Sequence, residues 1–167
     1  ETVADYTLSS GSHRLTVTGN YQRKRVHVLA EPWVTHVGDS RLYRCAAGRC
    51  EQLTEDHTLV AELVRNGLLL EEQARQHAAR SILLASLGTQ EGWPVQAQRI
   101  DPPRVGECFV LCSDGLWEYL TPPEIAAVVS PDRIEEGARQ LIDLARERGG
   151  RDNISVGVLA VRLPEAA

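Results

Sequence analysis

The segment at residues 108–112 constrains the fold more than any other part of the chain, because all five of its side chains are apolar. A strand of this kind is typical of a sheet that is covered on both faces. A second apolar segment, at residues 154–161, predicts another buried strand near the end of the sequence. Buried strands need other layers packed on them, so we expect a layered fold of sheets and helices.

Further strands and helices follow from hydrophobic spacing and from turn and capping residues. Gly19-Asn20 predicts a turn between two early strands, Gly48 predicts the turn of a hairpin over 42–53, and the sequence from Thr121 to Glu124 resembles a capping box. Asp56 is expected to cap a helix that ends at Gly67. The remaining strands are expected at 15–18, 26–30, 33–37, 81–87 and 95–100, and the remaining helices at 71–77, 121–129 and 132–148.

Composition excludes several classes of partner. The net charge is −5 and the one basic run, at residues 23–25, is short, which argues against a nucleic-acid or anionic-membrane surface. No segment approaches the roughly 20 apolar residues that a spanning helix needs, and the first residues do not resemble a signal peptide. We therefore expect a cytoplasmic protein that binds neither nucleic acid nor membrane.

The four cysteines are predicted to be free thiols. Cys45 and Cys50 flank the expected hairpin turn, while Cys108 and Cys112 would lie on one face of a strand about 13 Å apart, too far for a disulfide. Their spacing does not match a zinc site. We interpret all four as small buried side chains in a reducing compartment.

Three aspartates occupy positions where a carboxylate could be held rigidly. Asp114 follows one apolar strand and precedes a glycine, Asp152 precedes another apolar strand, and Asp39 lies in the turn before the hairpin. Rigid strand ends that carry carboxylates suit hard divalent cations, which prefer oxygen ligands. Ordinary Asx turns would explain the same residues. His57 has a similar ambiguity between a general acid or base and a structural role beside a helix cap.

Taken in order, five motifs resemble one known family. They are VGDSRLY at 37–43, LTEDH at 53–57, EQARQH at 72–77, LCSDGLW at 111–117 and GRDNI at 150–154. Their order and spacing are similar to those of the bacterial type 2C metal-dependent protein serine/threonine phosphatases over residues 34–163. The resemblance implies an α+β fold in which a two-layer antiparallel β-sandwich is flanked by helices.

The resemblance also implies roles for individual residues. It makes Asp114 and Asp152 ligands of an Mn²⁺ or Mg²⁺ pair, and it makes Asp39 a ligand of a third ion. The helical region at 56–80 corresponds to the family's flap, where a phosphoprotein substrate is recognised. The flap motif H-P-x-R-N reads HAARS here, which makes Arg80 and Ser81 the candidate substrate-binding residues. The implied reaction is hydrolysis of phosphoserine or phosphothreonine by a metal-activated water.

Two motifs of a complete family member are missing. The sequence lacks the R-x-x-N-E-D segment with the phosphate-binding arginine, and it lacks the V-A-D-G-M-G-G segment with the bridging aspartate; it also contains no Met. We interpret 1–167 as a single phosphatase-like domain in which residues 1–33 form divergent or rearranged strands. Either half of the domain is absent upstream, or residues 12–34 represent its first two strands and the segment after them is deleted.

These observations leave two functional hypotheses. One is an active metal-dependent phosphatase of phosphoserine and phosphothreonine in proteins. The alternative is a catalytically inactive phosphatase-like module that binds or regulates a partner protein. Since an incomplete sandwich would leave apolar sheet surface exposed, self-association is also expected.

Overall fold

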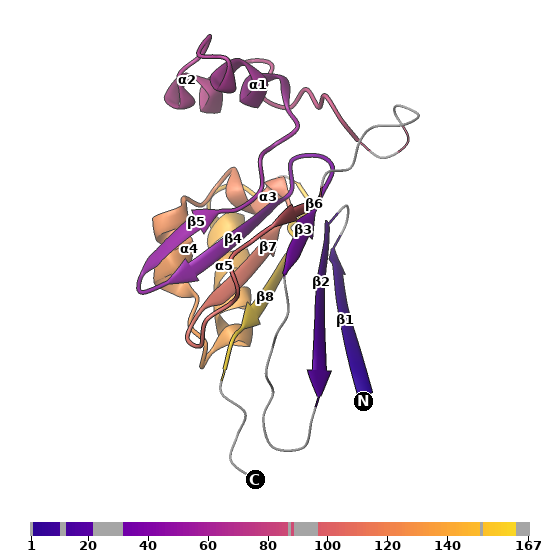
Figure 1. Cartoon of the computed structure of the whole chain (residues 1–167). Coiled ribbons are helices and arrows are strands. Elements are labelled where there is room, and N and C mark those ends of the chain that lie inside the picture. The colour runs from indigo at the N-terminus through magenta and orange to yellow at the C-terminus, as the bar shows by residue number, and fades with distance from the viewer. Residues whose placement is uncertain are drawn as a thin grey trace.

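The computed structural model describes residues 2–10, 13–21, 32–86, 88, 97–150 and 152–162, with only the backbone of the first two segments (Figure 1). The strands are β1 (Thr2–Ser10), β2 (His13–Tyr21), β3 (Trp33–Thr35), β4 (Arg41–Ala46), β5 (Arg49–Gln52), β6 (Ala97–Arg99), β7 (Cys108–Cys112) and β8 (Val156–Ala160). The helices are α1 (Leu59–Arg65), α2 (Glu71–Gln76), α3 (Asp114–Trp117), α4 (Pro122–Val128) and α5 (Ile134–Glu147).

The strands form two four-stranded sheets. Their orders are β1-β2-β3-β6 and β5-β4-β7-β8, and all neighbouring strands are antiparallel. Helices α4 and α5 pack against the second sheet, and α1 and α2 project from one end of the molecule (Figure 1). The predicted two-layer antiparallel sandwich with flanking helices is confirmed.

Strand β7 explains how the layers are held together. Its five residues are all buried, and successive side chains of a strand point to opposite faces of the sheet. Phe109 and Leu111 pack toward the first sheet, in a cluster with Val34, Leu42 and Ile100. The other three residues of β7 face the helices, in a cluster that includes Leu116, Ile125, Leu141 and Ala145. A strand in this central position has no solvent side, which is why its sequence is apolar throughout.

The helices behind the second sheet begin and end as the sequence predicts. Glu124 accepts a hydrogen bond from the backbone N–H of Thr121 at 2.8 Å, which is the reciprocal bond of a capping box. Helix α5 ends before Gly149, whose φ of +121° places it in the region that favours glycine. These caps fix the lengths of the two helices that cover the core.

Three local predictions are wrong. Gly19-Asn20 lies inside β2 rather than in a turn, because the strand continues to Tyr21 in register with β1. The described residues of 81–87 form a turn with a single bridge between Thr58 and Leu83, because this segment lies at the molecular surface, where no sheet receives it. The helix α1 is capped by the Thr58 side chain and not by Asp56, which forms an ion pair instead.

The cysteines divide into two kinds. Cys108 and Cys112 are free and buried, as predicted. Cys45 and Cys50 form a disulfide, so the expectation of four free thiols is wrong. The reason is the register of the hairpin, which places the two residues directly opposite each other with their Cα atoms 4.1 Å apart.

Two predicted features lie outside the described residues. The strand expected at 26–30 and the basic run at 23–25 lie among residues that the structure does not describe. Within the described ranges, no helix is both long and apolar enough to cross a membrane.

Candidate functional site

The three candidate aspartates lie at one end of the second sheet. Arg41 at the start of β4 pairs with Cys112 at the end of β7, and Cys112 pairs with Val156 at the start of β8. Asp39 precedes this start of β4, Asp114 follows the end of β7, and Asp152 precedes β8. The antiparallel register therefore brings the three loops to the same edge.

Two of these loops are bonded directly to each other. The Ser113 backbone N–H donates to the Ser155 carbonyl at 3.1 Å, and the Ser113 hydroxyl donates to the Asn153 carbonyl at 3.1 Å. The next residue, Gly115, approaches Asn153 so closely that an added Cβ would lie 2.5 Å from the Asn153 oxygen. The order Ser-Asp-Gly therefore fixes Asp114 against the loop that carries Asp152.

The carboxylates of Asp114 and Asp152 each accept a hydrogen bond from the next residue, and not from the residue two positions on as in an Asx turn. Oδ1 of Asp114 accepts from the N–H of Gly115 at 2.9 Å, and Oδ1 of Asp152 accepts from the N–H of Asn153 at 2.7 Å. Each carboxylate thus stabilises its own turn through one oxygen. This leaves the second oxygen of each group available as a ligand, because a carboxylate has about four acceptor positions.

Asp39 lies in a negative environment. Burial raises the pKa of its carboxyl above the usual value, and the negative charge of Asp114 raises it further. A hydrogen bond to its own backbone lowers the pKa of Asp39, Asp56 raises it, and Arg41 lowers it with the weakest influence of the five. The structure therefore brings Asp39 and Asp114 together as like charges.

The described residues do not complete a metal site. Asp39 and Asp114 supply the donor type that a hard divalent cation prefers. Yet the described part of the chain contains no group of three His, Cys, Asp or Glu side chains placed to hold a metal ion. Asp152 lies at the same edge but does not join the other two in such a group.

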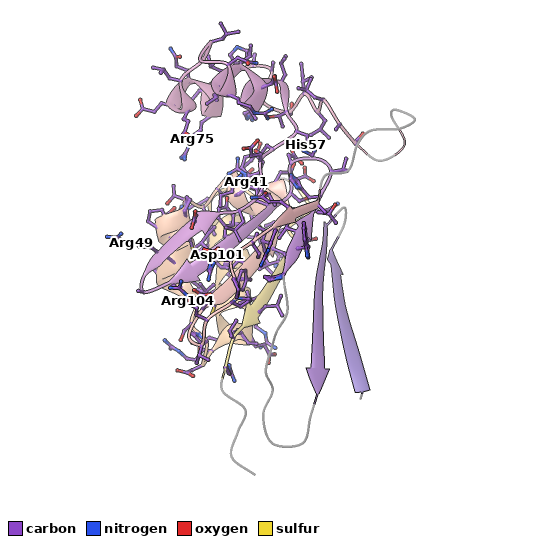
Figure 2. All side chains as sticks on the ribbon, viewed as in Figure 1. Arg41, Arg49, His57, Arg75, Asp101 and Arg104 are labelled. Carbon is purple, nitrogen blue, oxygen red and sulfur yellow. A yellow bond between two sulfur atoms is a disulfide. The ribbon has the colours of Figure 1, made fainter. Side chains whose placement is uncertain are left out.

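Sequence reasoning missed a cluster beside Asp39. The guanidinium of Arg41 donates to both carboxylate oxygens of Asp56 at 2.7–3.2 Å and lies 3.6 Å from the centre of the Trp117 ring. Trp117 in turn donates its indole N–H to the Asp39 carbonyl at 2.9 Å. Figure 2 shows Arg41 at this end of the sheet, below His57. Spacing alone could not reveal this cluster, because its members come from β4, α3 and the base of the flap.

His57 joins the flap to the same loop. Its backbone N–H donates to the Gly38 carbonyl at 2.9 Å, and its Nδ1 accepts from the Gly38 N–H at 3.2 Å. Its ring stacks on His36 with 4.5 Å between the centroids. Burial lowers the pKa of His57, and the neighbouring His36 and Arg65 lower it further. A neutral ring that accepts at Nδ1 is a structural link, which favours the structural role over that of general acid or base.

Arg80 and Ser81 lie on the exposed surface of the flap, in the turn after α2. The Nε of Arg80 is 3.7 Å from a carboxylate oxygen of Glu118, the residue that follows α3. The structure therefore brings Arg80 next to the short helix that begins with Asp114, and it leaves half of the Arg80 side chain exposed.

Comparison with known proteins shows which proteins this chain resembles. Residues 94–154 match the family described as "Protein phosphatase 2C". The chain is 36% identical over 128 residues to the serine/threonine protein phosphatase PstP of Mycobacterium tuberculosis, an alignment that covers 77% of this chain and 24% of PstP. The chain is therefore similar to proteins of the protein phosphatase 2C family. It spans between about a quarter and a half of the length of its curated phosphatase 2C relatives.

Solved phosphatase structures share the fold. The serine/threonine phosphatase of S. agalactiae superimposes with a TM-score of 0.75 and 33% identity, covering 90% of this chain and 58% of that one. The catalytic domain of PstP, solved in complex with two manganese ions, gives a TM-score of 0.61 and 28% identity, with 87% of this chain and 57% of that chain covered. The protein phosphatase 2C architecture therefore extends over most of the described residues.

Proposed function

We propose that this chain is part of a metal-dependent phosphatase that hydrolyses phosphoserine and phosphothreonine in proteins. The observation that carries the proposal is the convergence of Asp39 and Asp114 at one edge of a phosphatase 2C sandwich. Its curated relatives are serine/threonine phosphatases, and one of them has been solved with two manganese ions.

In this proposal Asp39, Asp114 and Asp152 contribute carboxylate ligands for Mn²⁺ or Mg²⁺. A divalent cation held there would lower the pKa of a water molecule and neutralise charge on the phosphoryl oxygens. Since the described residues provide no group of three ligands, the remaining ligands would come from residues outside this description.

Arg80 and Ser81 are the proposed contacts for the phosphoprotein substrate. A guanidinium is the side chain best suited to phosphate, because its planar donors match the phosphoryl oxygens. Arg80 is half exposed and lies beside α3, so it can reach a phosphate near Asp114 without leaving the flap.

One observation favours the second hypothesis, a catalytically inactive phosphatase-like module that binds or regulates a partner protein. Two neighbouring carboxylates are too few to hold a pair of cations, and the described residues offer no third ligand placed with them. If these residues act alone, binding of a phosphoprotein without hydrolysis is the expected activity.

The two hypotheses separate in one experiment. After its intact mass is confirmed, the chain is assayed with p-nitrophenyl phosphate and a phosphothreonine peptide in Mn²⁺, with an EDTA control. Asp114→Asn tests the candidate ligand, and Asp143→Asn on the exposed surface of α5 is the matched control. We expect Mn²⁺-dependent turnover that falls at least 100-fold in Asp114→Asn and is unchanged in Asp143→Asn, since removing an electrostatic group from an active site typically costs about 10²–10³ in rate. Absence of turnover from the folded chain would support the inactive module.

A further inference from the structure

We propose that Arg41 is a positioning residue, which fixes the spacing between the carboxylates of Asp39 and Asp114 by acting through Trp117. The inference rests on the proposed function, in which these two carboxylates share a cation. It assigns Arg41 no contact with substrate or cation.

The side chain of Arg41 is anchored by hydrogen bonds to two other side chains. Its guanidinium forms a fork with Asp56, through Nε to Oδ1 at 2.9 Å and Nη2 to Oδ2 at 2.7 Å. Nη1 donates to the hydroxyl of the fully buried Tyr43 at 3.1 Å. The side chains of Arg41 and Asp56 are only 20% and 9% exposed. A fork of this kind, held at three nitrogens, leaves the guanidinium plane little freedom to rotate.

Trp117 connects the guanidinium plane of Arg41 to Asp39 and Asp114. The guanidinium carbon lies 3.6 Å from the centre of the Trp117 ring, so the two planes form a cation–π pair. Trp117 ends the helix α3 that Asp114 begins, and its indole N–H donates to the Asp39 carbonyl at 2.9 Å. The ring that Arg41 orients is thus the link between the backbone of Asp39 and the helix of Asp114.

The link through Trp117 acts against the repulsion between the two carboxylates. Asp39 and Asp114 lie on adjacent loops at the same edge of the second sheet, and two carboxylates held close together repel each other when both are ionised. Arg41 is next but one to Asp39, yet its fork is bonded to Asp56. Its position therefore holds the backbone of Asp39 to the helix of Asp114, through Trp117, while the charge of the two carboxylates stays available to a cation.

A lysine at position 41 distinguishes the effect of the positive charge from the effect of the planar guanidinium. Arg41→Lys keeps a positive charge but loses the planar fork and the stacking surface. If only the charge matters, the substitution is tolerated. If the orientation of Trp117 matters, the bond to Asp39 weakens.

The chain contains a matched control three residues away. Arg44 donates from the single nitrogen Nη2 to both carboxylate oxygens of Glu107, at 2.8 and 2.7 Å, and the two side chains are 13% and 9% exposed. Because the spacing along β4 is odd, Arg44 faces the opposite side of the sheet, about 10 Å along the strand. Arg44→Lys therefore makes the same substitution in an ion pair of similar burial without touching the candidate site.

The experiment compares both lysine variants with the unaltered chain by two measurements. Hydrogen exchange followed by NMR reports the indole N–H of Trp117 and the amides of residues 38–40, and calorimetry reports Mn²⁺ affinity. We expect Arg41→Lys to exchange at least tenfold faster at these groups and to bind Mn²⁺ roughly tenfold more weakly or worse, as is typical when an outer-shell partner of a metal ligand is lost. Arg44→Lys is expected to change both quantities less than twofold. Equal effects of the two variants, or no effect of Arg41→Lys, would overturn the inference.

Two further arms keep the result interpretable. Trp117→Phe retains an aromatic ring under Arg41 but removes the donor to Asp39, and it should speed exchange at residues 38–40 as Arg41→Lys does; unchanged exchange would contradict the link. If the unaltered chain binds no Mn²⁺, the proposed function fails for this chain, and the exchange measurements alone decide the role of Arg41.

Discussion

At the scale of single residues, the candidate site depends on one close approach between backbones. An added Cβ at Gly115 would lie 2.5 Å from the carbonyl oxygen and 3.1 Å from the carbonyl carbon of Asn153. Backbone atoms cannot swing aside as the end of a long side chain can. The glycine after Asp114 is therefore a steric requirement of the contact between the two acidic loops.

Gly115→Ala should destabilise the fold by about 1–3 kcal/mol, the usual range for overpacking. The control is Gly157→Ala in β8, where the nearest atom to an added Cβ is 3.9 Å away, an ordinary contact distance. Urea denaturation of both variants measures the free energy of unfolding. Equal stability of the two variants would mean that the Asn153 loop moves freely to admit a methyl group.

At the scale of elements, the helices behind the second sheet are joined end to end. Arg148, after α5, donates to the Glu124 carboxylate at 2.6 Å and to the Tyr119 carbonyl at 2.8 Å. Glu124 also caps α4 by accepting from Thr121. One carboxylate thus holds the start of one helix to the end of the next.

The hydrogen bonds of Glu124 should make the stability of the fold depend on pH. The hydrogen bond from Arg148, and then those from Thr121, lower the pKa of Glu124 to about 2 from an ordinary value of 4.5. A lowered folded-state pKa gives stability that is fully present above pH 4.5 and is lost as the pH falls toward 2. Glu124→Gln should therefore be less stable than the unaltered chain at pH 7, and the difference should shrink below pH 4.5. Thermal unfolding at several pH values checks this, and a difference independent of pH would contradict it.

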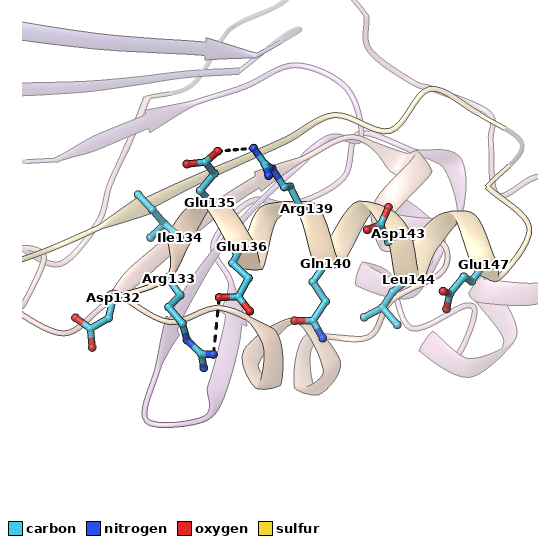
Figure 3. A pocket seen from close by; sticks show the side chains of 10 residues that line it. All are labelled: Asp132, Arg133, Ile134, Glu135, Glu136, Arg139, Gln140, Asp143, Leu144 and Glu147. Atoms are coloured by element: carbon cyan, nitrogen blue, oxygen red, sulfur yellow. Dashed lines mark hydrogen bonds and ion pairs between the residues drawn. The ribbon is translucent and has the colours of Figure 1, made fainter.

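At the scale of the whole molecule, the helices of the described part of the chain cover the two sheets unequally. Helices α4 and α5 pack on the second sheet (Figure 1). On the first, Val34 points into the core while its neighbour Trp33 is 45% exposed. A broad hollow of about 960 Å³ lies along the polar face of α5 and is lined by charged side chains such as Glu136 and Arg139 (Figure 3). Among the described residues, large exposed apolar side chains therefore occur on the first sheet, on the flap, as at Leu68 and Leu70, and in a loop at Val105.

Self-association through the first sheet stays a prediction. Trp33→Ser should shift the chain toward the monomer, because it removes a large apolar side chain from the outer face of β3. Val105→Ser changes an exposed apolar residue in a loop and is the control. Light scattering coupled to size exclusion measures the mass over a range of concentrations. A monomeric, folded species before any substitution would contradict the prediction.

The sequence by itself determined the layered fold, because hydrophobic spacing and caps are local properties. The five apolar residues of β7 predicted a central strand, and the capping box predicted the start of α4. The three aspartates were also visible, since each lies beside an apolar strand or a glycine turn. Where local signals were weak or shared, as in the segment from Ser81 to Ala85, the sequence predicted a strand that the fold does not form.

Tertiary structure decided how those residues are used. Asp56 could have capped a helix, yet it pairs with Arg41 across 15 residues and so anchors the guanidinium that lies over Trp117. The register of one hairpin paired Cys45 with Cys50, and the register of β4, β7 and β8 brought the aspartates to one edge. These outcomes depend on contacts between segments far apart in the chain or across a turn. Such contacts exist only once the sheets have packed, because packing alone sets which side chains face one another.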